Sequence, residues 1–247
     1  VDFDGMSVAP LLLGEDMALP DREIFVQYRQ NTNPPEKWVN AVMTRRWRLV
    51  GGDELYDIKA DPGQKNDVAS DYPDVVRRLR LAHERWWEEI SPRLTEYCPI
   101  SIGSEEENPT RLNSMDVLGD VAWNQGHIIK AQKSTGTWSI LVEQPGTYTF
   151  RLRRWPEELD LPLDSELPQD EAEQIPYTAG TDSTRIEPVT ARLELFGEEK
   201  TVEIHPEEKE VTFTLELDRT GKTRLEAWFA DEKGEERGAY YVYVERQ

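Results

Sequence analysis

The sequence is poor in cysteine, in histidine and in long apolar runs. Its one cysteine, Cys98, excludes a disulfide within the chain, so cysteine content does not indicate a cellular compartment. Three scattered histidines and this cysteine argue against a multi-ligand zinc site. No uninterrupted apolar run approaches the ~20 residues of a membrane-spanning helix. The first residues, Val1–Gly5, lack the basic start and the cleavage site of a secretory signal peptide.

Basic residues are also scarce. The 247 residues include 29 Lys and Arg against 49 Asp and Glu, a net charge of −20, which excludes a general phosphate-neutralising surface for nucleic acid. Residues 1–103 hold 13 basic and 18 acidic groups, whereas 104–247 hold 16 and 31. This asymmetry, and the polar stretch that begins at Ser104, predict two domains, 1–103 and 104–247.

The first domain has the pattern of a small antiparallel sheet with one long helix, an α+β arrangement. Residues 25–28 alternate as a strand does, and 38–50 and 54–58 indicate two strands around Gly51-Gly52. Arg45 interrupts the more apolar face of the strand expected at 38–50. Its guanidinium is expected either to reach solvent or a carboxylate, or to contact an anion. Asp71 and Pro73 mark the start of a helix that ends near Ile90. Its apolar stripe includes His83, which the spacing predicts to be a core-edge residue.

The second domain consists almost entirely of short strands, which predicts a mostly-β sandwich of the jelly-roll type. A Pro-Gly turn joins two of these strands into an expected hairpin, and the final strand is apolar on both faces and is therefore expected to be central. The expected strands are 127–131, 137–143, 147–154, 189–196, 200–205, 210–217, 223–230 and 239–245. The acidic segment 157–187 is expected to be a solvated loop and not a calcium site.

Two groups of residues in the second domain are candidates for ligand contact. Trp123, Gln125 and His127 combine an aromatic ring, an amide and an imidazole, a mixture that stacks on a sugar and binds its hydroxyl groups. The alternative is that Trp123 plugs the end of the sandwich, and the pattern favours this alternative. Arg151 and Arg153 share a strand face, where they are either neutralised by glutamates or available to an anion.

Several motifs resemble a known family. DGMSVAPLLLGE, AVMTRRWRLV, ELYDIKADPGQKNDVA and a helix ending in RWWEEI are similar, in order and spacing, to the C-terminal subdomain of the sulfatases, and most closely to the bacterial arylsulfatases. The second half, with GTYTFRLRRWP and GAYYVYV, resembles the appended β domain of some of these enzymes. Met43 departs from the pattern, because many relatives have an arginine before the threonine.

The resemblance implies that the catalytic machinery lies outside this sequence. Sulfatases use a formylglycine made from a Cys or Ser two residues before a proline, and none of the sixteen prolines here has either residue at that position. The formylglycine and a calcium ion are therefore expected in a missing N-terminal catalytic domain, with no catalytic residue and no metal ligand in this chain. We expect the chain alone not to hydrolyse sulfate esters.

The resemblance also implies a role. The chain is expected to complete a sulfatase catalytic domain, its main partner, and to contribute to the rim of the substrate pocket through Arg29, Gln30, Asn31, Asn33 and Arg45. A segment, MSVAPLLLG, is expected to expose an apolar patch and to allow self-association. In the second interpretation of Arg151 and Arg153, the anion is a sulfated substrate or a carboxylate of that domain. The resemblance also implies a location in the periplasm or outside the cell. The alternatives are a carbohydrate-binding module for sulfated glycans and an interaction scaffold.

Overall fold

The protein consists of two compact units, Val1–Glu96 and Tyr97–Gln247. The structure, a computed structural model, describes residues 5–28, 34–175, 178 and 180–247. The division falls earlier than the expected 103/104 boundary. The reason is that β5 (Ile100–Ile102) pairs in parallel with β8 (Thr137–Val142) and so belongs to the second unit.

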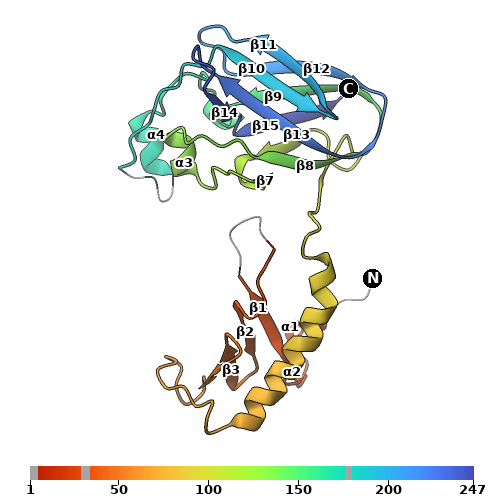
Figure 1. The fold of residues 1–247 in the computed structure, drawn as a ribbon, viewed down its shortest axis with the longest axis vertical. Coiled ribbons are helices and arrows are strands. Elements are labelled where there is room, and N and C mark those ends of the chain that lie inside the picture. The colour runs from red at the N-terminus through yellow and green to blue at the C-terminus, as the bar shows by residue number, and fades with distance from the viewer. Residues whose placement is uncertain (1–4, 29–33, 176–177, 179) are drawn as a thin grey trace. The chain divides into compact units, whose positions relative to one another are not determined.

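The first unit is a four-stranded antiparallel sheet with one long helix, as expected from the sequence. The strands β1 (Ile24–Gln27), β2 (Asn40–Met43), β3 (Trp47–Val50) and β4 (Glu54–Asp57) lie side by side in chain order. The 18-residue helix α2 (Pro73–Ile90) is the yellow helix of Figure 1. A short helix, α1 (Ala9–Leu12), precedes the sheet, and a 3-10 turn, η1 (Ser91–Arg93), follows α2.

One face of this sheet forms the core with α2. The register pairs Phe25 with Val42, Val42 with Leu49, and Leu49 with Leu55, so these residues share a face. Val42, Leu49 and Leu55 are fully buried, and they form one cluster with Leu79 of α2. The apolar stripe of α2 therefore covers this face, as its three- and four-residue spacing predicts.

The long strand expected over 38–50 is instead two strands joined by a turn at Thr44. The Thr44 hydroxyl accepts the backbone N–H of Trp47 at 3.0 Å, and the Thr44 N–H donates to the Trp47 carbonyl at 2.8 Å. Arg45 is therefore exposed in a turn and does not interrupt a strand face. The expected cap at Asp71 is also wrong, because Tyr72 occupies the N-cap without a side-chain bond, while Pro73 does begin the helix.

The second unit is a β-sandwich of two sheets, which Figure 1 shows in green to blue. One sheet has the order β11-β10-β13-β8-β5, with β14 paired to β13 and β7 paired to β8; the other has the order β12-β9-β15-β6. Their remaining strands are β6 (Thr110–Asn113), β7 (Val117–Leu118), β9 (Gly146–Arg153), β10 (Thr190–Leu195), β11 (Glu198–Glu203), β12 (Val211–Leu217), β13 (Gly221–Ala230), β14 (Glu236–Gly238) and β15 (Tyr241–Arg246).

The core of the sandwich is built from alternate residues of both sheets. Trp138, Ile140 and Val142 of β8 and Tyr148, Phe150 and Leu152 of β9 belong to a single buried cluster. The buried face of each strand is thus as its alternation predicts. The expected hairpin between the two strands is wrong, because β8 and β9 lie in different sheets and the Pro-Gly turn carries the chain across. β15 is central, between β9 and β6, as expected.

Helical segments occur at two places where a strand and a loop were expected. The strand expected at 127–131 is a short helix, α3 (Gln125–Ile129), whose Ile128 and Ile129 are buried. Segment 157–187 contains the 3-10 turn η3 (Glu157–Leu159) and α4 (Gln169–Gln174), and it buries Leu163, Leu167 and Ala172, so it is not simply a solvated loop. A further 3-10 turn is η2 (Ser114–Asp116). In the part of the chain that the structure describes, no helix is long and apolar enough to cross a bilayer.

The β3–β4 turn makes the first testable prediction. Gly51 and Gly52 both have positive φ, but a Cβ on Gly52 would lie 2.8 Å from the Trp38 ring, whereas the nearest atom to a Cβ on Gly51 is 4.0 Å away. Both alanine variants pay the backbone cost of positive φ, so Gly51→Ala is the matched control. We expect Gly52→Ala to lower the free energy of unfolding by about 1–3 kcal/mol more than Gly51→Ala does. Chemical denaturation monitored by tryptophan fluorescence measures both, and equal losses would contradict a packing role for Trp38.

Candidate functional site

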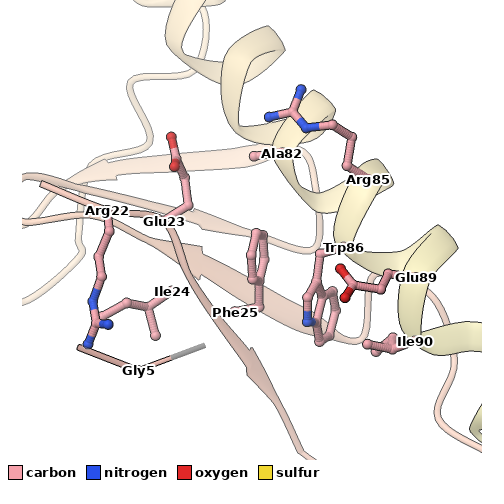
Figure 2. Close-up of a pocket in the computed structure, with 10 residues that line it drawn as sticks. All are labelled: Gly5, Arg22, Glu23, Ile24, Phe25, Ala82, Arg85, Trp86, Glu89 and Ile90. Atoms are coloured by element: carbon pink, nitrogen blue, oxygen red, sulfur yellow. The ribbon is translucent and has the colours of Figure 1, made fainter. Parts of the chain in front are cut away.

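A hollow lies in the first unit, between β1 and the C-terminal half of α2 (Figure 2). Its volume is about 620 Å³. The strand side is formed by residues 22–25 and the helix side by Ala82, Arg85, Trp86, Glu89 and Ile90, with Gly5 at one end. Successive side chains of a strand point to opposite faces. Arg22 and Ile24 accordingly project toward Gly5, and Glu23 and Phe25 project toward the helix (Figure 2).

Stacked aromatic rings form one wall of this pocket. The rings of Phe25 and Trp86 are nearly parallel, with centroids 4.8 Å apart and planes at 8°. Both side chains are half-buried, so the pair is anchored in the unit while its edge remains accessible. Apolar contact and stacking are therefore available to a ligand in the pocket.

Charged groups of both signs surround the aromatic wall. The side chains of Arg22, Glu23, Arg85 and Glu89 line the pocket, and no hydrogen bond or ion pair joins these side chains to another described residue. Elsewhere on α2 such pairs do form: Lys37 binds Glu84, and Arg80 binds Asp53. The four groups at the pocket are thus available to a ligand or partner that carries polar groups beside an apolar one.

Behind the aromatic wall lies a buried histidine. His83 is fully buried, stacks on Trp38 with centroids 3.7 Å apart, and lies at an angle to Trp86. Asn40 Nδ2 donates to His83 Nε2 at 2.6 Å and to Gln27 Oε1 at 3.1 Å. Burial lowers the pKa of His83; the Lys37 charge lowers it further, against an opposing effect of Glu84. A proton on Nε2 would also face the Asn40 amide donor, so the geometry favours the neutral imidazole.

The residues expected at a substrate rim fall at different places. Arg29, Gln30, Asn31 and Asn33 lie outside the described residues. Arg45 lies beside a smaller hollow of about 260 Å³, lined also by Met6, Val8 and Met43. Its backbone N–H donates to Asp21 at 3.0 Å, and its guanidinium donates to the Leu19 carbonyl, so this arginine is already engaged within the unit.

In the structure the side chains of Trp123 and His127 are in contact, whereas the side chain of Asn124 caps a helix. Trp123 is 51% exposed, and its ring meets the His127 ring edge-on, with centroids 5.3 Å apart. Asn124 caps α3 by accepting the His127 backbone N–H at 2.9 Å, while Gln125 is exposed beside it. The expectation that Trp123 plugs the sandwich is therefore wrong, because a plug would be buried.

The arginines of β9 have partners within the protein. Arg151 and Arg153 both bind Glu210, at 3.3 and 2.8 Å, and Arg151 also binds Glu157. Arg153 is buried. Neutralisation by neighbouring glutamates, the first of the two interpretations, thus describes this cluster, and a free anion site at Arg151 and Arg153 is not present in this arrangement.

The next residue, Arg154, is a buried cation held by carbonyl groups. It is fully buried, and burial lowers its pKa to about 10, so it remains charged at neutral pH. Its guanidinium donates to the carbonyls of Ser165, Thr184 and Ile129 and lies 4.3 Å from the centroid of the Trp155 ring. This cation ties the long 157–187 segment to α3, a role that its sequence position does not reveal.

Among the described residues, no group of three or more His, Cys, Asp or Glu side chains is arranged to hold a metal ion. No family model and no curated protein matches the sequence. Among solved structures the chain is similar to the crystal structure of alpha-L-fucosidase from Vibrio sp. strain EJY3, with 12% identity and a TM-score of 0.34. The match covers 60% of this chain and 24% of the fucosidase chain, and it carries no argument about function.

Sequence reasoning did not find the pocket between β1 and α2. Arg22, Glu23, Arg85 and Glu89 resemble ordinary surface charges, because their grouping depends on β1 being an outer strand beneath the end of α2. The only signal was the spacing of Trp86 and Ile90 on the apolar stripe, which extends beyond the residues that cover β3 and β4.

His83 gives a prediction about pH. Its pKa in the folded protein is below the unfolded value of 6.5, so the unfolded chain binds more protons between these two values. Stability of the first unit should therefore decrease as pH falls below about 6.5, by at most about 1.4 kcal/mol per pH unit. Denaturation between pH 5 and 7.5 measures this slope, and His83→Gln should remove it. A slope unchanged in the variant would assign the effect to other groups.

Proposed function

We propose that this chain is the C-terminal portion of a sulfatase-type hydrolase and completes the fold of a separate catalytic portion. That portion would supply the formylglycine nucleophile and the calcium ion. The proposal joins the resemblance of residues 2–90 to sulfatases with one structural observation, the apolar surface around α1. This chain would then contribute packing and a side of the substrate pocket, and no catalytic group.

The observation that supports the proposal is that no residue of the short helix α1 is buried. α1 has only four residues, none of them buried, and the leucines that end it and follow it are almost fully exposed: Leu12 by 82% and Leu13 by 78%. So short a helix is not stable alone in water. Adjacent exposed leucines also favour association with another surface. A partner that covers Leu12 and Leu13 would provide both the burial and the support.

The second face of the small sheet is a further apolar surface. Ile24 and Val26 are 46% and 44% exposed, on the face opposite α2. Their cross-strand neighbours are Met43 and Ala41, which makes the centre of that face apolar. Such a face is usually covered when a sheet lies inside a larger protein.

The proposal predicts that the chain restores activity to a catalytic portion. A bacterial arylsulfatase cut immediately before its own DG-x-S segment would be coexpressed with this chain, and hydrolysis of 4-nitrophenyl sulfate measured. We expect a complex with activity above that of the cut enzyme alone. The double variant Leu12→Asp, Leu13→Asp should weaken the complex at least about tenfold, because two leucines lose their burial.

The control is Leu81→Asp, which changes an exposed leucine on the outer face of α2. It should leave the complex unchanged. Equal weakening by the two variants would mean a general effect of added charge. Aryl sulfate turnover by the purified chain alone would contradict the proposal outright.

A second candidate function, glycan recognition by the second unit, is favoured by Trp123. An exposed indole whose ring is positioned by His127, with the Gln125 amide nearby, offers an apolar surface and hydrogen-bonding groups to a sugar ring. In this candidate the unit would direct an enzyme to its polymer and take no part in the chemistry.

Calorimetric titration with matched sulfated and desulfated oligosaccharides tests this candidate. We expect Trp123→Ala to weaken glycan binding about tenfold, because stacking on the indole is lost. The matched control is Met115→Ala, another exposed apolar residue of the same unit. Because Arg151 and Arg153 already bind glutamates, both forms of the glycan should bind equally well. No heat with either glycan would reject this function.

A further inference from the structure

The two outer strands of the small sheet differ in whether the backbone groups at their outer edges are hydrogen-bonded. At β4, the Leu55 carbonyl accepts the Val68 N–H at 2.9 Å, and the Leu55 N–H donates to Asp67 Oδ1 at 3.0 Å. The loop that follows β4 therefore covers that edge. At β1, no described residue makes a corresponding backbone bond, so within the described part of the chain β1 presents an open edge.

The pairing of β2 shows which groups of β1 point outward. The Asn40 carbonyl accepts the Gly51 N–H at 3.1 Å, so the backbone of Asn40 faces β3. Backbone groups alternate in direction along a strand, so Ala41 and Met43 face β1, where their partners are Val26 and Ile24. It follows that the N–H and C=O groups of Phe25 and Gln27 point to the open edge.

The residues of β1 do not protect this edge. Natural sheets shield their outer strands with lysine, proline, bulges or inward-pointing charges. β1 reads Ile-Phe-Val-Gln, with none of these features. A strand of this composition is a ready template for another strand.

The pocket of Figure 2 adjoins this edge and would hold a side chain of an added strand. A residue opposite Phe25 would direct its side chain to the same face as Phe25, toward α2. There it would meet the Phe25–Trp86 stack and Ile90. The hollow of about 620 Å³ is large enough for a bulky apolar side chain, and Arg22, Glu23, Arg85 and Glu89 would surround its polar neighbours.

We propose that the groove between β1 and α2 binds an extended peptide segment of a partner polypeptide, which adds as a fifth strand and places a bulky apolar side chain against Phe25 and Trp86. Recognition of this kind combines main-chain hydrogen bonds with a pocket for alternate side chains. The inference does not depend on the proposed sulfatase role.

A pair of variants at Gln27 tests the role of the open edge. Gln27→Pro removes the outward N–H without removing a bond to β2, a change that edge strands tolerate. Gln27→Ala is the matched control, because both variants lose the contact of the Gln27 side chain with Asn40, while only the proline loses the N–H. The probe is the synthetic peptide acetyl-Lys-Thr-Val-Phe-Val-Thr-Glu-amide, titrated into ¹⁵N-labelled chain.

We expect amide shifts confined to residues 22–27 and 82–90, with binding to Gln27→Pro about fivefold weaker than to Gln27→Ala. Two altered peptides test the groove without changing the protein. N-methylation of the phenylalanine amide should weaken binding, since that amide faces β1, and replacement of the phenylalanine by alanine should weaken it through loss of the pocket contact. Shifts elsewhere, equal binding to the two Gln27 variants, or no binding up to the solubility limit of the peptide would overturn the proposal.

Discussion

The first unit depends on one contact, the packing of α2 against a single face of a sheet whose strands have only four residues each. Strands this short gain little from their own hydrogen bonds, and a sheet needs a covered apolar face to be stable. α2 supplies that cover through Leu79, and its C-terminal half reaches β1 through Trp86, whose ring stacks on that of Phe25. The opposite face and the β1 edge receive no comparable cover from the described residues. The packing that stabilises the unit thus leaves two surfaces uncovered, the second face of the sheet and the β1 edge. These are the surfaces on which partners are proposed to bind.

The second unit meets a different constraint, the placement of arginines within a strongly acidic chain. Arg153 and Arg154 are consecutive and both buried, yet their charges are met differently, by the Glu210 carboxylate and by three backbone carbonyls. The carbonyl arrangement fixes a long segment without a carboxylate, so a substitution at Arg154 would free polar groups at several places at once. A buried cation of this kind organises the segment around it and is not accessible to a ligand.

Much of the fold could be predicted from alternation and spacing, because these report which side of an element is buried. The stripe of α2 and the alternate core residues of β8 and β9 are examples. Alternation does not show where a strand turns or which sheet it joins. Thr44 turns the chain through a local bond, in which its hydroxyl accepts the Trp47 N–H. The Pro-Gly turn joins two sheets, because the buried faces of β8 and β9 pack together in the core. A turn motif does not reveal whether its strands pair or face each other.

The candidate site was harder to predict for a related reason. Trp123 is aromatic, and aromatic residues are usually core, so the sequence favoured a buried plug; the structure instead uses Asn124 to cap α3, and the helix start leaves the indole outside. For Arg151 and Arg153 the sequence offered neutralisation by glutamates as one interpretation but did not identify the partner, because Glu210 is far away along the chain. At the β1 edge, the decisive property is which backbone groups lack a neighbour, and this follows from strand order, not from residue type. Because an open edge accepts many sequences through the main chain, selectivity there must come from the side-chain pocket, where the Phe25–Trp86 wall, Ile90 and the four surrounding charges distinguish one strand from another.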